Sequence, residues 1–229
     1  AITELVFPVF KGDAQTQSQL EQSAPEMFAH FRGVPGIRTL FRGGIVRDGG
    51  EPVQPPSGRN VLVLGLAPKD FPLLLPAIFL LFVVVVVVAD MLTMVTSEWD
   101  QASSFHAFFP ESDAFKAFVG LAKPLLGGPP TRPELFDADA GTSAPCSSSA
   151  VTQVIKVSRG ESTQKAWSAL QETISASGKS AEPAFFHGNG IEHREDAFLG
   201  MIGWRSLEVS ISLFFFFLPR SSKHAPRKT

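Results

Sequence analysis

The sequence predicts an α+β fold built from two copies of a β-α-β-β unit. Two stretches of alternating β-branched residues, "ITELVFPV" at 2–9 and "VTQVIKVS" at 151–158, have the pattern of an opening strand. Each is followed by a polar amphipathic stretch with helical spacing, at 13–31 and at 161–178. A chain of 229 residues, 44% of them hydrophobic, is long enough to bury a core in both copies.

The two copies keep the same order of elements after the helix. Two strand-like segments follow in each copy: 37–47 and 60–65 in the first, 183–193 and 198–203 in the second. The second copy then continues directly into Trp204, and the first has Trp99 at the corresponding place in "SEWDQ". We therefore treat Trp99 and Trp204 as equivalent positions of the repeat and expect both to be structural residues at the end of a third strand.

An uncharged apolar stretch interrupts the first copy. Residues 71–89 include six consecutive valines and lie within an apparent insertion at about 66–97. Three interpretations are open: a transmembrane helix, a buried strand over 83–88, or translated non-coding sequence. We favour the third, because removal of residues 66–97 brings the two copies into step. Pro72 and Pro76 disfavour a helix, so we expect no membrane span and a segment that is dispensable for the fold.

The domain boundaries follow from the repeat. The first unit is predicted at 1–140, a Ser-rich linker at 141–148, and the second unit at 149–208. The tail at 209–229 is rich in Phe and then basic, and is not expected to belong to the fold. The second unit thus lacks a second helix and a fourth strand. This truncation predicts open edge strands and exposed apolar surface, and therefore poor solubility or self-association.

Composition excludes several classes of function. The net charge of −2 gives no electrostatic footprint for a nucleic acid. The single cysteine, Cys146, rules out a disulfide or a cysteine-based zinc site within one chain. The chain opens "AITELVF", which is not the pattern of a signal peptide, so a reducing, cytoplasmic location is expected.

A helical stretch after the insertion resembles a known family. The segment "SSFHAFFPESDAFKAFVGLAKPLL" at 103–126 is similar to the second helix of the dimeric alpha-beta barrel superfamily, in particular to fungal proteins of the antibiotic-biosynthesis-monooxygenase (ABM) type. "PELFDAD" at 133–139 resembles the closing fourth strand. The residues that carry the likeness are Trp99, His106, Phe109, Ser112, Ala114, Phe115, Lys116, Phe118, Lys123, Pro124 and Leu125. The resemblance implies tandem ferredoxin-like βαββαβ units whose antiparallel sheets pair into one barrel.

The resemblance also implies a function. ABM-type proteins include cofactor-independent monooxygenases that act on aromatic substrates in a cavity between sheet and helices, and the 21 Phe residues suit a small apolar or aromatic ligand. The alternative is a non-catalytic module of the same fold that binds a ligand or haem, or serves in stress. No cofactor is expected for the enzyme, whereas haem is the cofactor expected for the alternative, the binding module. Both alternatives stay open because fold alone does not fix function.

His106 is the candidate catalytic residue. Burial among Phe side chains would lower the pKa of its imidazole, and a neutral imidazole could accept a proton from a substrate or ligate haem iron. Phe105, Phe109, Trp99 and Trp204 are the candidate lining of the substrate cavity. A structural histidine on the helix surface is the simpler interpretation and is favoured, because a lone histidine is seldom catalytic without a partner.

Two other motifs predict turns. His187 and His193 flank a "GNG" turn, and their spacing to the neighbouring acidic residues matches no standard zinc motif. No metal site is expected there. The glycine pairs of "FRGGIVRDGGE" at 41–51 lack the Lys-Ser/Thr and the helix of a phosphate-binding loop.

Overall fold

A computed structural model describes residues 1–46, 59–65, 91–129, 132–139, 141–177 and 183–206. Its strands are β1 (Ile2–Val6), β2 (Val9–Phe10), β3 (Ile37–Val46), β4 (Arg59–Gly65), β5 (Met91–Trp99), β6 (Glu134–Ala138), β7 (Val151–Ser158), β8 (Ala184–Gly190) and β9 (Ala197–Trp204). Its α-helices are α1 (Ala14–Ala29), α2 (Ala102–Phe108), α3 (Asp113–Ala122), α4 (Ala144–Ser147) and α5 (Glu161–Ala176). Two short 3-10 helices complete it, η1 (Lys123–Leu125) and η2 (Glu192–Arg194).

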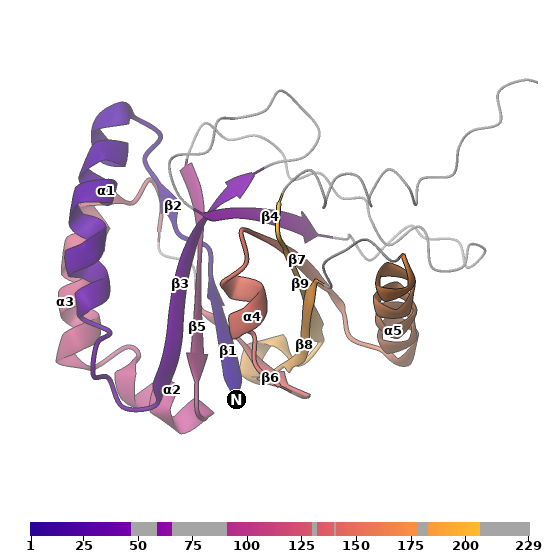
Figure 1. Ribbon diagram of the computed structural model, residues 1–229. Helices are drawn as coiled ribbons and strands as arrows, with labels where there is room; N and C mark the ends of the chain where they lie inside the picture. Colours follow the sequence, from indigo (N-terminus) through magenta and orange to yellow (C-terminus); the bar gives the residue numbers. More distant parts are fainter. Residues whose placement is uncertain (47–58, 66–90, 130–131, 140, 178–182, 207–229) are drawn as a thin grey trace, which may run out of the picture.

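The strands form one curled sheet that closes on itself. Their order is β1-β6-β8-β9-β7-β4-β3-β5-β2, and β1 also pairs with β5, so the strands from β1 round to β5 make a ring (Figure 1). Within it, β6-β1-β5-β3 is the antiparallel 4-1-3-2 order of a βαββαβ unit, and β8-β9-β7 repeats the 2-3-1 part. The predicted α+β fold of two ferredoxin-like units in a barrel-like arrangement is confirmed.

The register of the strands shows the internal repeat. Ile2 faces Trp99 across β1 and β5, and Val151 faces Trp204 across β7 and β9, so the two tryptophans are equivalent as predicted. The third strand of the first unit is therefore β5 and not the segment at 60–65. Residues 91–97 of the predicted insertion belong to this strand, so the expectation that 66–97 is dispensable is wrong for that part. Residues 66–90 lie outside the described residues.

Strand β4 fills the position of the missing fourth strand of the second unit. It lies between β7 and β3 and runs parallel to both. The expectation of an open edge at this place is therefore corrected, because a strand from the first unit pairs with β7. The sequence could not reveal this, since β4 reads as an ordinary member of its own unit.

Helices α1, α2, α3 and α5 cover the outer side of the ring, whereas α4 contributes Cys146 to its inner side. Figure 1 shows α1 and α3 side by side over the first unit and α5 over the second, while α4 sits between the two units. Asp13 begins α1 by accepting a hydrogen bond from the Thr16 amide at 2.8 Å, and Ser112 begins α3 by accepting one from the Phe115 amide at 3.1 Å. The predicted linker at 141–148 is itself ordered, with Ser143 and Cys146 buried.

Separate apolar clusters fill the two sides of the sheet. The cluster inside the ring contains Leu5, Met94, Phe136, Cys146, Val154, Phe186, Ala197, Leu199 and Met201. The outer side of the second unit packs Trp167 and Ile174 of α5 on Phe198 and Ile202. Among the described residues, each helix is too short or too polar to cross a bilayer, and the apolar stretch at 71–89 lies outside those residues.

The turn from β8 into η2 predicts a steric test of the fold. A Cβ added at Gly190 would lie 1.9 Å from the backbone oxygen of Arg194, which a side-chain rotation cannot relieve. Gly190→Ala should lower the free energy of unfolding by about 3 kcal/mol, the upper end for overpacking. Gly120→Ala is the control, because nothing lies within 4 Å of the added Cβ in helix α3 and the change should stabilise the helix by about 0.5–1 kcal/mol. Urea denaturation of both variants measures the difference, and equal stabilities would contradict the close approach of Gly190 to the Arg194 backbone.

Candidate functional site

A buried carboxyl group lies on the outer face of the first unit's sheet. Strand β1 places Glu4 directly opposite Ser97 of β5. One carboxyl oxygen of Glu4 accepts hydrogen bonds from the Ser97 hydroxyl and, at 2.9 Å, from the Trp99 indole nitrogen. Burial raises the pKa of the Glu4 carboxyl, and these two hydrogen bonds partly offset the rise. Glu4 is therefore a titratable group in an apolar setting, which is typical of functional sites.

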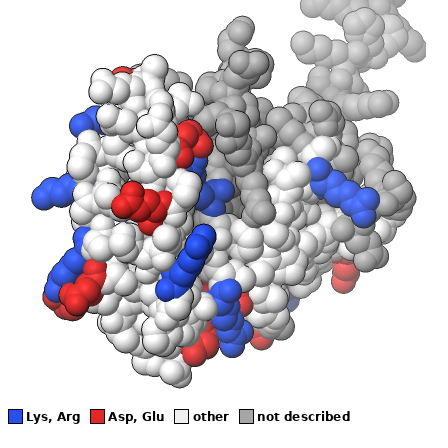
Figure 2. Space-filling view, turned by 60° about the vertical axis from the view of Figure 1, so that its left-hand side comes forward, with Lys and Arg blue, Asp and Glu red and all other residues white. Residues whose placement is uncertain are grey.

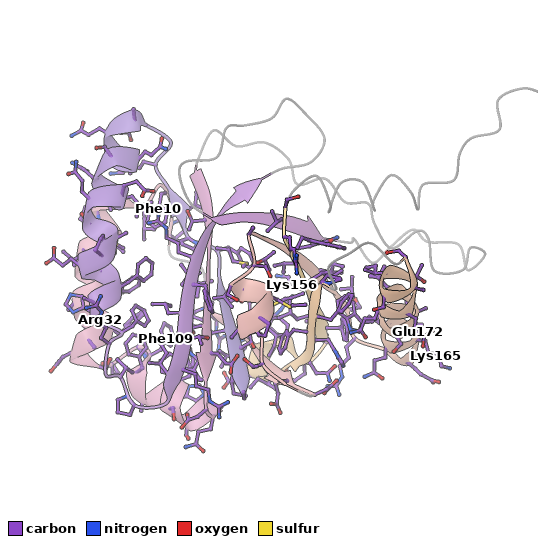
Figure 3. The ribbon with its side chains drawn as sticks, in the orientation of Figure 1. Phe10, Arg32, Phe109, Lys156, Lys165 and Glu172 are labelled. Atoms are coloured by element: carbon purple, nitrogen blue, oxygen red, sulfur yellow. The ribbon has the colours of Figure 1, made fainter. Side chains whose placement is uncertain are left out.

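An aromatic cluster covers this carboxyl group from the helix side. Trp99 is fully buried, and its ring centroid lies 5.8 Å from that of Phe105 and 5.4 Å from that of Phe108. Phe31 at the end of α1 continues the cluster, 5.0 Å from Phe108. Figure 3 shows Phe109 in the same layer between the helices and the sheet. The sheet, α1, α2 and α3 thus enclose a layer of Phe and Trp side chains next to Glu4.

His106 does not point into this layer. Its side chain is 50% exposed on α2, and its Nε2 atom lies 2.5 Å from a carboxyl oxygen of Glu192 in η2 of the second unit. The expected burial of His106 among Phe side chains is wrong. The helix turns Phe105 and Phe108 inward and leaves His106 on the outer side.

The predicted cavity residues separate into two groups. Phe105, Phe109 and Trp99 belong to one cluster, in which Phe109 stacks on Phe105 at 5.3 Å between ring centroids. Trp204 belongs to the cluster of the second unit, where its indole nitrogen donates to the side-chain oxygen of Gln153 at 3.1 Å. In the described part of the chain, Trp99 and Trp204 therefore belong to different clusters and do not line one cavity.

In each unit a tryptophan indole donates a hydrogen bond to the first strand, but the acceptor is a carboxyl group in one unit and an amide in the other. Glu4 and Gln153 occupy equivalent positions of β1 and β7, and each accepts a hydrogen bond from the equivalent tryptophan. Gln153 accepts this hydrogen bond with a group that does not titrate, whereas the Glu4 carboxyl group does titrate. The sequence held this signal, because the repeat "ITELVFPV" and "VTQVIKVS" aligns Glu4 with Gln153. Glu4 is the functional candidate that the sequence reasoning missed.

The remaining ionisable candidates, His187 and Cys146, are packed or paired within the fold. His187 stacks on Phe198 and lies 3.5 Å from a carboxyl oxygen of Asp139. Burial raises the pKa of the Cys146 thiol to about 12, so it stays protonated and unreactive near neutral pH. Groups of three or more His, Cys, Asp or Glu side chains that could hold a metal are absent from the described ranges.

A small recess lies inside the ring. It contains about 220 Å³ of empty space, part of it open to solvent, and is lined by Phe41, Arg42, Gly43, Met94, Thr96, Ser147 and Thr152. Only about 10 Å³ of it is open to the centre of a water molecule, which is too little for an aromatic ligand. The buried hydroxyls of Thr96 and Ser147 have no hydrogen-bond partner. The recess is therefore suited to water and not to an aromatic ligand.

Charged side chains are interspersed on the surface of the first unit. Figure 2 shows Lys and Arg next to Asp and Glu on the face that carries α1 and α3. Ion pairs such as Arg42 with Glu21, at 2.7 Å, and Lys116 with Glu111, at 3.2 Å, account for this mixture. A large patch of one sign is not seen on this face.

Comparisons with known proteins give a likeness in fold. No protein-family model and no curated protein matches the sequence. A solved structure titled "putative monooxygenase" from Fusobacterium nucleatum subsp. nucleatum ATCC 25586 is similar with a TM-score of 0.49 and 9% identity, over 92% of this chain and 78% of that chain. A second "putative monooxygenase", from Lactobacillus acidophilus NCFM, has a TM-score of 0.45 and 8% identity, over 93% of this chain and 80% of that chain. At these identities the likeness concerns overall shape alone.

Proposed function

We propose that the first unit is a small-molecule site, and that it works as a monooxygenase without a bound cofactor on a small aromatic substrate. The observation that supports this proposal most is the buried Glu4 carboxyl with its raised pKa, next to a layer of aromatic side chains. The substrate would lie between the sheet and the helices. Phe109 and Phe118 are only partly buried, so they are the side chains that would move to admit it.

The proposed chemistry uses the substrate as the reductant. An aromatic compound with an acidic CH₂ group loses a proton to the Glu4 carboxylate, and the carbanion reduces dioxygen. One oxygen atom becomes the C=O group of the product and the other leaves as water, so that CH₂ and O₂ give C=O and H₂O. A carboxylate with a raised pKa is a stronger base than a free one, which is the property that this step requires.

A binding module without catalysis is the second candidate. The hydrogen bond of Trp204 to Gln153 favours it, because an amide makes the same contact in the second unit and serves packing alone. In this case the aromatic layer would hold a flat apolar ligand. His106 would not be a ligand of a haem held in this layer, because its side chain lies on the outer side of α2 and contacts Glu192.

Oxygen consumption separates the two candidates. Purified protein with an anthrone-type substrate should consume one O₂ for each quinone formed, with no added flavin or metal. The same sample should be titrated with haem while the Soret band is followed. Oxygen uptake with no Soret shift supports the enzyme. A saturable Soret shift with no oxygen uptake supports the binding module, and the absence of both responses would contradict the small-molecule site.

A further inference from the structure

A histidine and a carboxylate lie side by side where the two units meet, at β6 of the first unit and β8 of the second. The antiparallel ladder of these strands pairs Asp137 with Asn189. Side chains two positions apart on a strand share a face, so Asp139, just after β6, and His187 are the next pair on the same face. The fold thus brings together two residues that lie 48 positions apart in the sequence, since 187 − 139 = 48.

The distance between His187 and Asp139 is too long for a hydrogen bond. The Nε2 atom of His187 lies 3.5 Å from Oδ2 of Asp139. An N–H···O hydrogen bond in a protein has about 2.7–3.2 Å between its heavy atoms. Two ligands of a tetrahedral Zn²⁺ ion, each about 2.0–2.2 Å from the metal, are about 3.4 Å apart. The pair therefore has the spacing of two ligands of one metal ion.

Buried neighbours hold both side chains in place. His187 stacks on Phe198 with 5.8 Å between ring centroids, and the Trp167 ring lies 6.2 Å from that of His187. The side-chain amide of Asn189 donates a hydrogen bond to Oδ1 of Asp139 at 2.7 Å, and Asn189 is only 8% exposed. A hydrogen bond of this kind orients a carboxylate ligand in metal sites. The Oδ1 atom of Asn189 is buried without a hydrogen-bond partner.

The pair is open to solvent and lies in a negative setting. The side chains of His187 and Asp139 are 30% and 42% exposed, so an ion and its water molecules have access. Asp137 adds a second carboxylate on the same face. An imidazole nitrogen and a carboxylate oxygen are a donor set that suits Zn²⁺ and similar transition-metal ions. Because the described residues contain no group of three His, Cys, Asp or Glu ligands, water must complete the coordination.

We propose that His187 Nε2 and Asp139 Oδ2 bind one divalent transition-metal ion, such as Zn²⁺, at the seam between the two units. Water molecules complete the tetrahedron, and one of them can donate to the unpaired Oδ1 of Asn189. The ion connects β6 of the first unit with β8 of the second, so its binding stabilises the folded chain. The sequence gave no expectation of a metal here because Asp139 is distant from His187 along the chain. This inference does not depend on the proposed enzyme function.

A zinc titration of the unsubstituted protein, followed by NMR of the histidine ring nitrogens, tests the site directly. Zn²⁺ should shift the Nε2 resonance of His187 until the site is saturated. The same additions should raise the Tm of the protein, because an ion that binds only the folded state stabilises it. A His187 resonance that does not move when Zn²⁺ is added would overturn the proposal.

Variants of the two ligands and of their neighbour show whether the same atoms bind the ion. Asp139→Asn removes the anionic ligand but keeps an acceptor for Asn189, and His187→Phe keeps a ring that can stack on Phe198. Each should lose the rise of Tm with Zn²⁺. Asn189→Ala keeps both ligands and should weaken zinc binding by about 10–100-fold, the usual cost of losing a contact that orients a ligand.

The second pair of a histidine and a carboxylate in the fold supplies the matched control. Nε2 of His106 lies 2.5 Å from a carboxyl oxygen of Glu192, which is too close for two ligands of one metal ion. Glu192→Gln should therefore bind Zn²⁺ as tightly as the unsubstituted protein. Equal zinc affinity of Asp139→Asn and Glu192→Gln would overturn the proposal, because the ion would then not depend on the Asp139 carboxylate.

Discussion

The Glu4→Gln variant is expected to lose turnover of the aromatic substrate and yet to be more stable than the unsubstituted protein at neutral pH. The amide keeps an acceptor for the Ser97 hydroxyl and the Trp99 indole, as Gln153 does for Trp204. It cannot take a proton from a substrate, so oxygen uptake should fall by at least a hundredfold, in the usual range for loss of a general base. It also removes a buried charge that the surroundings compensate only in part.

The pH dependence fixes the sign of the stability change. The pKa of Glu4 is raised in the folded state above 4.5, so the folded protein binds this proton more tightly than the unfolded chain does. Stability from Glu4 is therefore fully present below pH 4.5 and is lost as the pH rises through the folded pKa. The glutamine of Glu4→Gln cannot ionise, so the variant does not lose this stability as the pH rises. Its free energy of unfolding should equal that of the unsubstituted protein at pH 4 and exceed it by about 1–3 kcal/mol at neutral pH.

Urea denaturation at pH 4 and at pH 7.5 measures the effect, and the second unit supplies the matched control. Gln153→Glu places the same carboxyl group next to Trp204 and should make the protein less stable as the pH rises. A Glu4→Gln variant that is less stable at neutral pH would show that the Glu4 charge is fully compensated in the fold. In that case its role as a base of raised pKa would be rejected.

Replacement of Trp99 should have the largest effect on stability. The side chain is fully buried and contacts Phe105 and Phe108, so Trp99→Ala should lower the free energy of unfolding by about 3–5 kcal/mol. Trp99→Phe keeps most of the packing but removes the indole donor to Glu4. Because that hydrogen bond lowers the pKa of Glu4, its loss should raise this pKa further.

Trp204→Phe is the control for this substitution. It removes the same hydrogen bond from the neutral Gln153, so its effect on stability should not depend on pH. Calorimetry of both variants between pH 4 and pH 8 measures the difference. If the stabilities of Trp99→Phe and Trp204→Phe depend on pH in the same way, the Trp99 hydrogen bond does not affect the titration of Glu4.

The repeat made most of the fold predictable. Alternation in "ITELVFPV" and "VTQVIKVS", the helical spacing after each, and the equivalence of Trp99 and Trp204 all correspond to observed elements. These signals are strong because burial of one face imposes a period on the sequence. The resemblance at 103–126 predicted one helix, whereas the structure has two, α2 and α3, with Pro110 between them. Proline disfavours a helix interior, so the sequence did hold the signal for this break.

The sequence did not reveal which strand-like segment pairs with β1. Both 60–65 and 91–99 have strand character, and only the register identifies β5 as the third strand of the unit. Pairing between distant segments leaves no local pattern, so β4 was assigned to the wrong neighbours. The same limit applies to His106, because helical spacing alone did not decide which residues of a Phe-rich helix face inward.

An NMR titration of the Glu4 carboxyl carbon, assigned by comparison with Glu4→Gln, tests most directly whether Glu4 is a base of raised pKa. We expect a midpoint above 4.5, the ordinary value, because burial disfavours the carboxylate more than Ser97 and Trp99 stabilise it. A midpoint at or below 4.5 would contradict it, since Glu4 would then be a fully compensated structural carboxylate like many others in folded proteins.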